Sequence, residues 1–151
     1  MNNLIAEDIN CQNTLYIKAT NEKVWNALVV PVEVSKYYMC PMINCGTKIG
    51  DPIEFGVANK VMIGGHILNI IVNDTFSYSF KFEPNEIDSD ENYKTNLNIK
   101  ISEDKGITKF ILVHSGFKDK GQSYADIVDG WPWILSNMKA YIETGKTLNE
   151  K

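Results

Sequence analysis

The side chains that could perform chemistry are few and scattered along the chain. Of the 151 residues, 2 are histidines and 3 are cysteines. His66 or His114 could act as a general acid or base in a pocket, because imidazole titrates near neutral pH. Such a residue is more often a structural histidine with hydrogen-bonded ring nitrogens. The sequence leaves both interpretations open, and we assign no catalytic residue.

The cysteines give a weak metal-binding pattern. Cys40 and Cys45 are separated by four residues and could form half of a site that His66 or Cys11 completes. Zinc sites usually combine two close pairs of ligands, and no second pair follows here. A Cys–His nucleophile pair would lack a nearby residue to orient it. We therefore predict no metal and no cofactor, and reduced thiols of the kind found in the cytoplasm.

Three carboxylates are candidates for general acid–base catalysis: Glu33, Asp51 and Glu54. Charged residues near turns are mostly solvated. Glu54 alone lies within a strand pattern, where a pocket-facing carboxylate would need hydrogen bonds. The sequence contains no phosphate-binding glycine loop, zinc-protease helix motif or nucleophile elbow. Nucleotide hydrolysis, zinc proteolysis and lipase-type hydrolysis thus have no support.

Composition limits the partners further. A chain of 17.1 kDa forms one ordinary domain, which we place over residues 1–151. All 15 basic residues are lysines, and the chain has 19 acidic residues, which gives a net charge of -4. Nucleic-acid binding requires clustered cations and is not expected. We also expect no membrane span and no secretory leader, because apolar runs of the required length are missing.

The spacing of apolar residues along the chain predicts the strands and helices that must position a site. Alternating apolar residues predict a first strand over 14–18, and helical spacing after Thr20 or Asn21 predicts a short helix. Pro31 starts a second helix that reaches Tyr37 or Tyr38. Further strands are predicted over 53–57, 61–73, 76–82, 97–101 and 107–114. The acidic stretch 83–92 is expected to be an exposed loop.

Two local features stand out within these elements. Paired glycines at 64–65, inside a strand, predict a bulge or a close backbone approach. Phe76, Tyr78, Phe80 and Phe82 alternate with polar or charged residues, which puts the four aromatic rings on one face of a strand.

The last segment has a helical period. Trp131, Leu135, Met138 and Ile142 are spaced by four, three and four residues, and Gly145 is a suitable C-terminal cap. Pro132 allows two interpretations. The helix begins just before it with Asp129 as cap, or a longer helix from about Gln122 bends there. We favour the longer, bent helix.

Several short motifs occur in an order that carries a family resemblance. They are Ile17-Lys18-Ala19-Thr20, Lys23-Val24-Trp25, Lys36-Tyr37-Tyr38, Gly65 with Ile67, Phe76 with Tyr78, His114-Ser115-Gly116-Phe117 and Gly130-Trp131-Pro132 through Gly145. Over residues 13–145 this order resembles the START-like (SRPBCC) superfamily, and within it the homologues of the activator of the heat-shock-protein-90 ATPase. The resemblance implies an α+β helix-grip fold. In that fold a curved antiparallel sheet, here of six or seven strands, wraps around a long C-terminal helix, with two short helices after strand 1.

The resemblance also suggests a function, because a curved sheet gripping one helix often encloses a cavity. We predict binding of a small hydrophobic or amphipathic ligand, although core packing alone would explain the same apolar residues. The candidate cavity residues are Trp25, Tyr38, Phe55, Phe76, Tyr78, Phe80, His114, Phe117, Trp131, Leu135 and Met138. One alternative is a stand-alone interaction domain with a chaperone partner, as in the activator. A second is a cyclase- or hydrolase-like enzyme using Tyr78, His114 and Glu54.

Overall fold

The computed structural model describes residues 9–82 and 94–150. The predicted loop at 83–92 lies outside the described residues. The elements are β1 (Ile9–Ile17), α1 (Asn21–Val29), α2 (Pro31–Val34), β2 (Met42–Cys45), β3 (Pro52–Val57), β4 (Lys60–Ile71), β5 (Thr75–Phe82), β6 (Thr95–Asp104), β7 (Ile107–Phe117) and α3 (Gln122–Thr144). This order confirms the α+β helix-grip fold.

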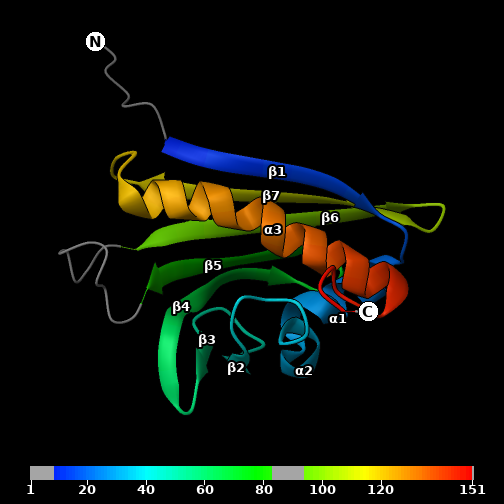
Figure 1. Cartoon of the computed structure of the whole chain (residues 1–151), viewed down its shortest axis with the longest axis horizontal. Helices are drawn as coiled ribbons and strands as arrows, with labels where there is room; N and C mark the ends of the chain where they lie inside the picture. Colours follow the sequence, from blue (N-terminus) through cyan, green and yellow to red (C-terminus); the bar gives the residue numbers. More distant parts are fainter. Residues whose placement is uncertain (1–8, 83–93, 151) are drawn as a thin grey trace, which may run out of the picture.

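The strands form one antiparallel sheet of seven strands, in the order β1-β7-β6-β5-β4-β3-β2. Consecutive strands from β2 to β7 are neighbours, whereas β1 reaches across to pair with β7. Figure 1 shows the sheet curving around α3, with α1 and α2 at the end where α3 finishes. The core therefore lies between the concave face of the sheet and the helices.

Local chemistry explains the two short helices. The Thr20 hydroxyl accepts a hydrogen bond from the Lys23 amide and so caps α1. Pro31 occupies the first turn of α2, where its missing N–H costs nothing. The helix α2 ends at Val34, earlier than predicted, but turn hydrogen bonds continue as far as Tyr38, whose amide donates to the Val34 carbonyl.

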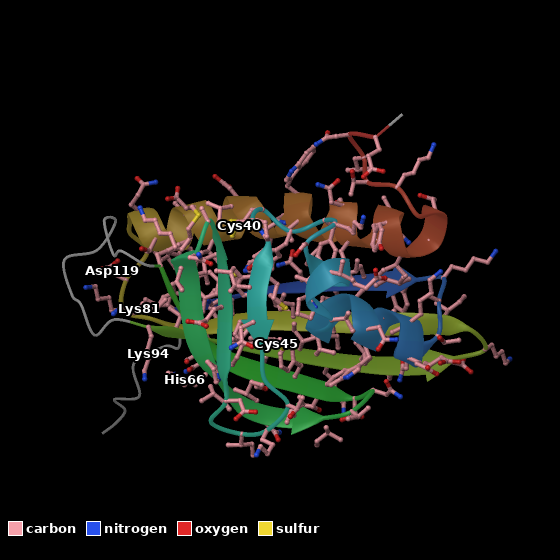
Figure 2. All side chains as sticks on the ribbon, turned by 90° about the horizontal axis from the view of Figure 1, so that it is seen from below. Cys40, Cys45, His66, Lys81, Lys94 and Asp119 are labelled. Carbon is pink, nitrogen blue, oxygen red and sulfur yellow. The ribbon has the colours of Figure 1, made fainter. Side chains whose placement is uncertain are left out.

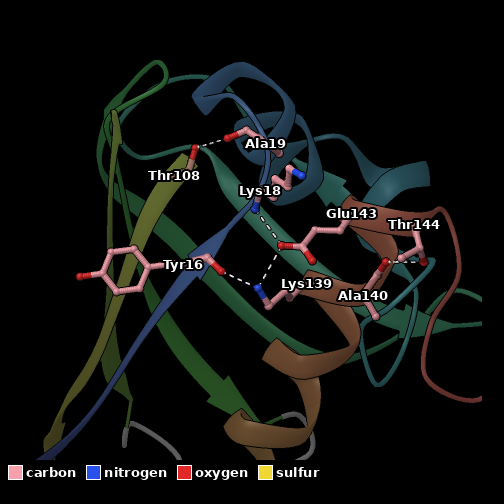
Figure 3. Close-up of polar contacts among 8 residues, drawn as sticks. All are labelled: Tyr16, Lys18, Ala19, Thr108, Lys139, Ala140, Glu143 and Thr144. Carbon is pink, nitrogen blue, oxygen red and sulfur yellow. Dashed lines mark hydrogen bonds and ion pairs between the residues drawn. The ribbon is translucent and has the colours of Figure 1, made fainter. Parts of the chain in front are cut away.

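The longer of the two predicted C-terminal helices is confirmed. It runs unbroken from Gln122 to Thr144 with Pro132 inside it, and Gly145 ends it in the left-handed conformation at φ 82°. Figure 3 shows how its last turns are fastened to the end of β1. The Lys139 ammonium donates to the Tyr16 carbonyl at 2.6 Å and pairs with Glu143, which also accepts from the Lys18 amide at 2.7 Å.

Several strand assignments needed correction, and β6, which runs from Thr95 to Asp104, is also longer than the predicted 97–101. Residues 42–45 form the edge strand β2, which the short sequence Met-Ile-Asn-Cys did not reveal. The strand β1 begins at Ile9 instead of Thr14, and β7 continues to Phe117. Both extensions occur because β1 and β7 pair along their length, up to the contact of Ile9 with Phe117.

The paired glycines mark a close approach, as predicted. A Cβ atom on Gly65 would lie 1.7 Å from the Ser79 carbonyl oxygen on the neighbouring strand. Only a residue without a side chain fits there. No helix in the described parts of the chain is long and apolar enough to cross a membrane.

A cavity beneath the long helix as candidate functional site

A small cavity lies between the sheet and α3, and its volume is about 20 Å³. That is room for one or two water molecules. The lining is almost entirely apolar or aromatic: Leu28, Val34, Tyr37, Tyr38, Phe55, Phe76, Tyr78, Ile99, Phe110, Leu112, Trp131, Ile134, Leu135 and Met138.

The walls of this cavity differ in how firmly they are held. Strands β3, β5, β6 and β7 supply the floor, and α3 supplies the roof. The remaining wall comes from α1, the single turn of α2 and the irregular residues after it. It includes Tyr38, which stacks on Phe55 with 4.5 Å between ring centroids and lies 6.3 Å from the Trp131 ring. This wall alone has neither strand pairing nor a long helix to fix it.

The polar groups at the cavity are phenols. The Tyr37 hydroxyl donates to the Ala27 carbonyl at 2.7 Å. The buried hydroxyl of Tyr38 has no hydrogen-bond partner among the described residues. Burial raises the pKa of Tyr37, Tyr38 and Tyr78. All three hydroxyls therefore stay protonated near neutral pH and remain hydrogen-bond donors.

His114 lies at the other end of Trp131 and is fully buried. Its Nδ1 accepts from the Trp131 indole N–H at 3.0 Å, and its Nε2 lies 2.6 Å from the Thr95 hydroxyl. An indole nitrogen can only donate, so the proton of the neutral ring resides on Nε2 and is donated to Thr95. The Thr95 hydroxyl in turn donates to the Phe80 carbonyl at 3.3 Å.

This chain of hydrogen bonds occupies both nitrogens of the imidazole. Burial also lowers the pKa of His114 to about 3, so the ring is neutral at physiological pH. Neither nitrogen is available to exchange a proton with a ligand. The structure thus places His114 in the structural role that the sequence left open, as a link between β7, β6 and α3.

The predicted cavity residues divide into two groups. Seven line the cavity: Tyr38, Phe55, Phe76, Tyr78, Trp131, Leu135 and Met138. The other four are buried around it. Trp25 packs edge-on against Phe76 at 5.9 Å, while Phe80 and Phe117 each lie 4.9 Å from the His114 ring. Met138 and its neighbours on α3 do face the aromatic strand, as the two apolar stripes predicted.

Sequence reasoning missed half of the lining. The missed residues are Leu28, Val34, Tyr37, Ile99, Phe110, Leu112 and Ile134. Alternation in 97–101 already placed Ile99 on a buried face, and that signal would have found it, whereas residues 107–114 are apolar at both parities and do not single out Leu112. Tyr37 belongs to the motif Lys36-Tyr37-Tyr38, but neither its bond to the Ala27 carbonyl nor the contact of Thr95 with His114 has a sequence signal.

The remaining chemical candidates are not brought together. Figure 2 shows Cys40, Cys45 and His66 at separate places. No three histidine, cysteine or acidic side chains within residues 9–82 and 94–150 are placed to hold a metal ion. Burial raises the pKa of Cys45 to about 11, which keeps this thiol unreactive. Glu54 alternates with the core residues Ile53 and Phe55 and so faces the opposite side of the sheet.

Comparison with solved structures supports the fold. The Aha1 dimer from Colwellia psychrerythraea superposes with a TM-score of 0.75 at 20% identity, covering 91% of this chain and 98% of that one. A protein from Mesorhizobium loti gives 0.74 at 18% identity, with 87% and 94% covered. An HSP90 activator from Plasmodium falciparum gives 0.72 at 16% identity, with 88% and 95% covered.

Sequence comparison supplies the family. No curated protein matches the sequence. Residues 18–143 match the family described as Activator of Hsp90 ATPase homolog 1-like protein. This match extends from the end of β1 to the last turn of α3 and includes every residue that lines the cavity. The chain therefore belongs to the family of Activator of Hsp90 ATPase homolog 1-like proteins.

Proposed function

We propose that this protein binds a small amphipathic ligand in the cavity between the sheet and α3, without catalysing a reaction. The observation that carries the proposal is the Tyr38 hydroxyl, which is buried at an apolar cavity and has no partner among the described residues. A buried hydroxyl without a hydrogen bond costs about 1–3 kcal/mol. A ligand with one polar group and an apolar body recovers this energy.

The cavity must widen to admit such a ligand, because 20 Å³ holds only water-sized molecules. The wall that includes Tyr38 is the part able to move, since strand pairing and α3 hold the rest. Hiding ~200 Å² of apolar ligand surface yields ~5 kcal/mol before the cost of association. The free energy needed to move the wall reduces this gain, so we expect micromolar affinity or weaker.

Two measurements test the proposal. Native mass spectrometry of the protein purified from cells should reveal a bound lipid-like molecule. The fluorescent probe 1-anilinonaphthalene-8-sulfonate, which combines apolar rings with one charged group, should bind the folded protein and raise its melting temperature. Failure of both measurements would refute ligand binding.

A pair of substitutions locates the probe. Met138→Trp fills the cavity and should abolish probe binding, at a cost of ~1–3 kcal/mol from overpacking. Met62→Trp makes the same change at a methionine that is 42% exposed and does not line the cavity. Met62→Trp should bind the probe like wild type. Equal probe binding by the two variants would place the probe elsewhere.

A second candidate function is interaction with a chaperone ATPase, as the family match and the Plasmodium falciparum HSP90 activator suggest. Titrating this protein into a purified Hsp90 should then raise the rate of ATP hydrolysis. An unchanged rate at saturating protein would remove this candidate. The enzyme alternative is weaker, because His114 has no free ring nitrogen and Glu54 faces away from the cavity.

A further inference from the structure

A second pocket lies outside the core, where α1, α2 and the end of α3 meet. Its volume is about 210 Å³, roughly ten times that of the cavity. Its lining is Lys23, Ala27, Glu33, Tyr141, Ile142 and Gly145. None of these residues lines the cavity, and Figure 1 shows the three helix segments gathered at one end of the molecule. The pocket is therefore a separate site.

One wall carries negative charge. The Tyr141 hydroxyl donates to one carboxylate oxygen of Glu33 at 2.9 Å and fixes its orientation. Burial, this hydrogen bond and the nearby charges of Glu33 and Glu150 raise the pKa of Tyr141. The last turn of α3 contains no basic residue, and the C-terminal end of the helix dipole adds partial negative charge.

Lys23 brings a positive charge to the same pocket. It lies four residues before Ala27, so both side chains are on the same face of α1. Lys23 and Glu33 both line the pocket, yet within the described residues no ion pair joins the Lys23 ammonium to the Glu33 carboxylate. A pocket that presents separate opposite charges matches a ligand that carries both.

The floor and the opening complete the site. Ala27 and Ile142 are each 2% exposed and provide an apolar base. Gly145 ends α3 in a left-handed conformation, and a Cβ atom there would meet nothing within 4 Å. The rim at Gly145 is therefore open to a ligand.

We propose that this pocket binds a small zwitterion of the amino-acid class. Its ammonium group pairs with Glu33 on α2, its carboxylate pairs with Lys23 on α1, and a modest apolar side chain rests on Ala27 and Ile142. These groups are largely accessible to water, so each pair contributes little and the affinity is in the millimolar range.

The test uses the full chain, labelled with ¹⁵N, and three matched probes. L-leucine carries both charges, isoamylamine lacks the carboxylate and 4-methylpentanoate lacks the ammonium group. L-leucine should cause saturable shifts in the amide signals of residues 23–33 and 141–145. Each single-charge probe should bind at least tenfold more weakly.

Variants that each remove one charge form the second part of the test. Glu33→Gln and Lys23→Met should each weaken L-leucine binding at least fivefold. Glu22→Gln and Lys60→Met make the same changes at exposed residues that do not line the pocket and should leave the affinity unchanged.

The proposal would be overturned by the absence of a saturable shift with L-leucine, by unchanged affinity in both pocket variants, or by equal binding of isoamylamine and L-leucine. The last result would mean that the pocket recognises only a cation, such as a basic side chain of a partner protein. Shifts confined to the cavity residues would overturn this proposal but support ligand binding in the core, so the two sites are tested independently.

Discussion

Two adjacent tyrosines allow the same substitution to be tested with opposite expected signs. The Tyr38 hydroxyl is buried and has no hydrogen-bond partner among the described residues. Tyr38→Phe removes the cost of about 1–3 kcal/mol that an unpaired hydroxyl imposes. The ring, which stacks on Phe55 at 4.5 Å, stays in place. The space left by one oxygen, on the order of 10 Å³, costs only about 0.2 kcal/mol. We expect a net stabilisation of about 1–2 kcal/mol.

Tyr37→Phe is the control and should have the reverse effect. The Ala27 carbonyl would normally accept from the amide of the residue four positions later, but that residue is Pro31, which has no N–H. The Tyr37 hydroxyl takes over this role at 2.7 Å. Its removal leaves a buried carbonyl unpaired and should destabilise the fold by ~1–3 kcal/mol.

Urea unfolding at pH 7, followed by far-ultraviolet circular dichroism, measures both effects. The free energies of unfolding of the two variants should differ by ~2–5 kcal/mol, while the slope of the free energy against urea concentration stays unchanged. A stability of Tyr38→Phe equal to wild type would show that water satisfies the hydroxyl in the cavity. A destabilised Tyr38→Phe would refute the reasoning, and it would remove the main support for a ligand at this position.

Three further predictions concern the core and the sheet. Trp25→Ala should cost ~3–5 kcal/mol in chemical denaturation, because the ring is 5% exposed, and a loss under ~1 kcal/mol would contradict its role as an anchor. His114 should make stability fall as pH falls: its pKa is about 3 when folded and ~6.5 when unfolded, so unfolding takes up a proton between these values. Unfolding free energy should drop by ~2 kcal/mol from pH 7 to pH 5, and His114→Gln should largely abolish this drop. Gly65→Ala should prevent stable folding, because the new Cβ atom would meet the Ser79 carbonyl, whereas Gly130→Ala on open helix surface should stabilise by ~0.5–1 kcal/mol in thermal melts.

The elements with a long, regular pattern were predictable from the sequence. Phe76, Tyr78 and Phe80 alternate and are all buried, as the period of two required. The same period predicts exposure for Ser77 and Ser79, yet each is only 4% exposed. Their hydroxyls bond to the side chain of Asn98 and the amide of His66 on the two adjacent strands.

The serines show why pattern reasoning fails locally. In a curved sheet with register shifts, a small polar side chain on the outer face is covered by its neighbours. The shift in β4 between Ile67 and Asn69 is one such place. Periodicity assumes a regular strand and does not contain this information.

The site was less predictable than the fold because its key contacts join distant segments. His114 meets Thr95 only because the register of β6 against β7 places Leu97 opposite His114. The size of the cavity depends on how well side chains fill the space under α3, and composition does not reveal this. The aromatic stripe predicted where a cavity would be, but not that it would hold only water-sized molecules.

The position of β1 in the sheet has a consequence for how the protein is made. Among the described strands β1 pairs only with β7, and the pairing joins Ile9 to Phe117, which is far away in the sequence. A ribosome adds about 5–20 residues per second, so β1 waits roughly 5–20 s for its partner, given the ~100 residues between them. Such long-range pairing also slows folding to milliseconds or longer. The roof of the cavity and the open rim of the outer pocket both belong to α3 and its C-terminal cap, which follow β7. A nascent chain therefore acquires both sites together, and only after β7 has been made.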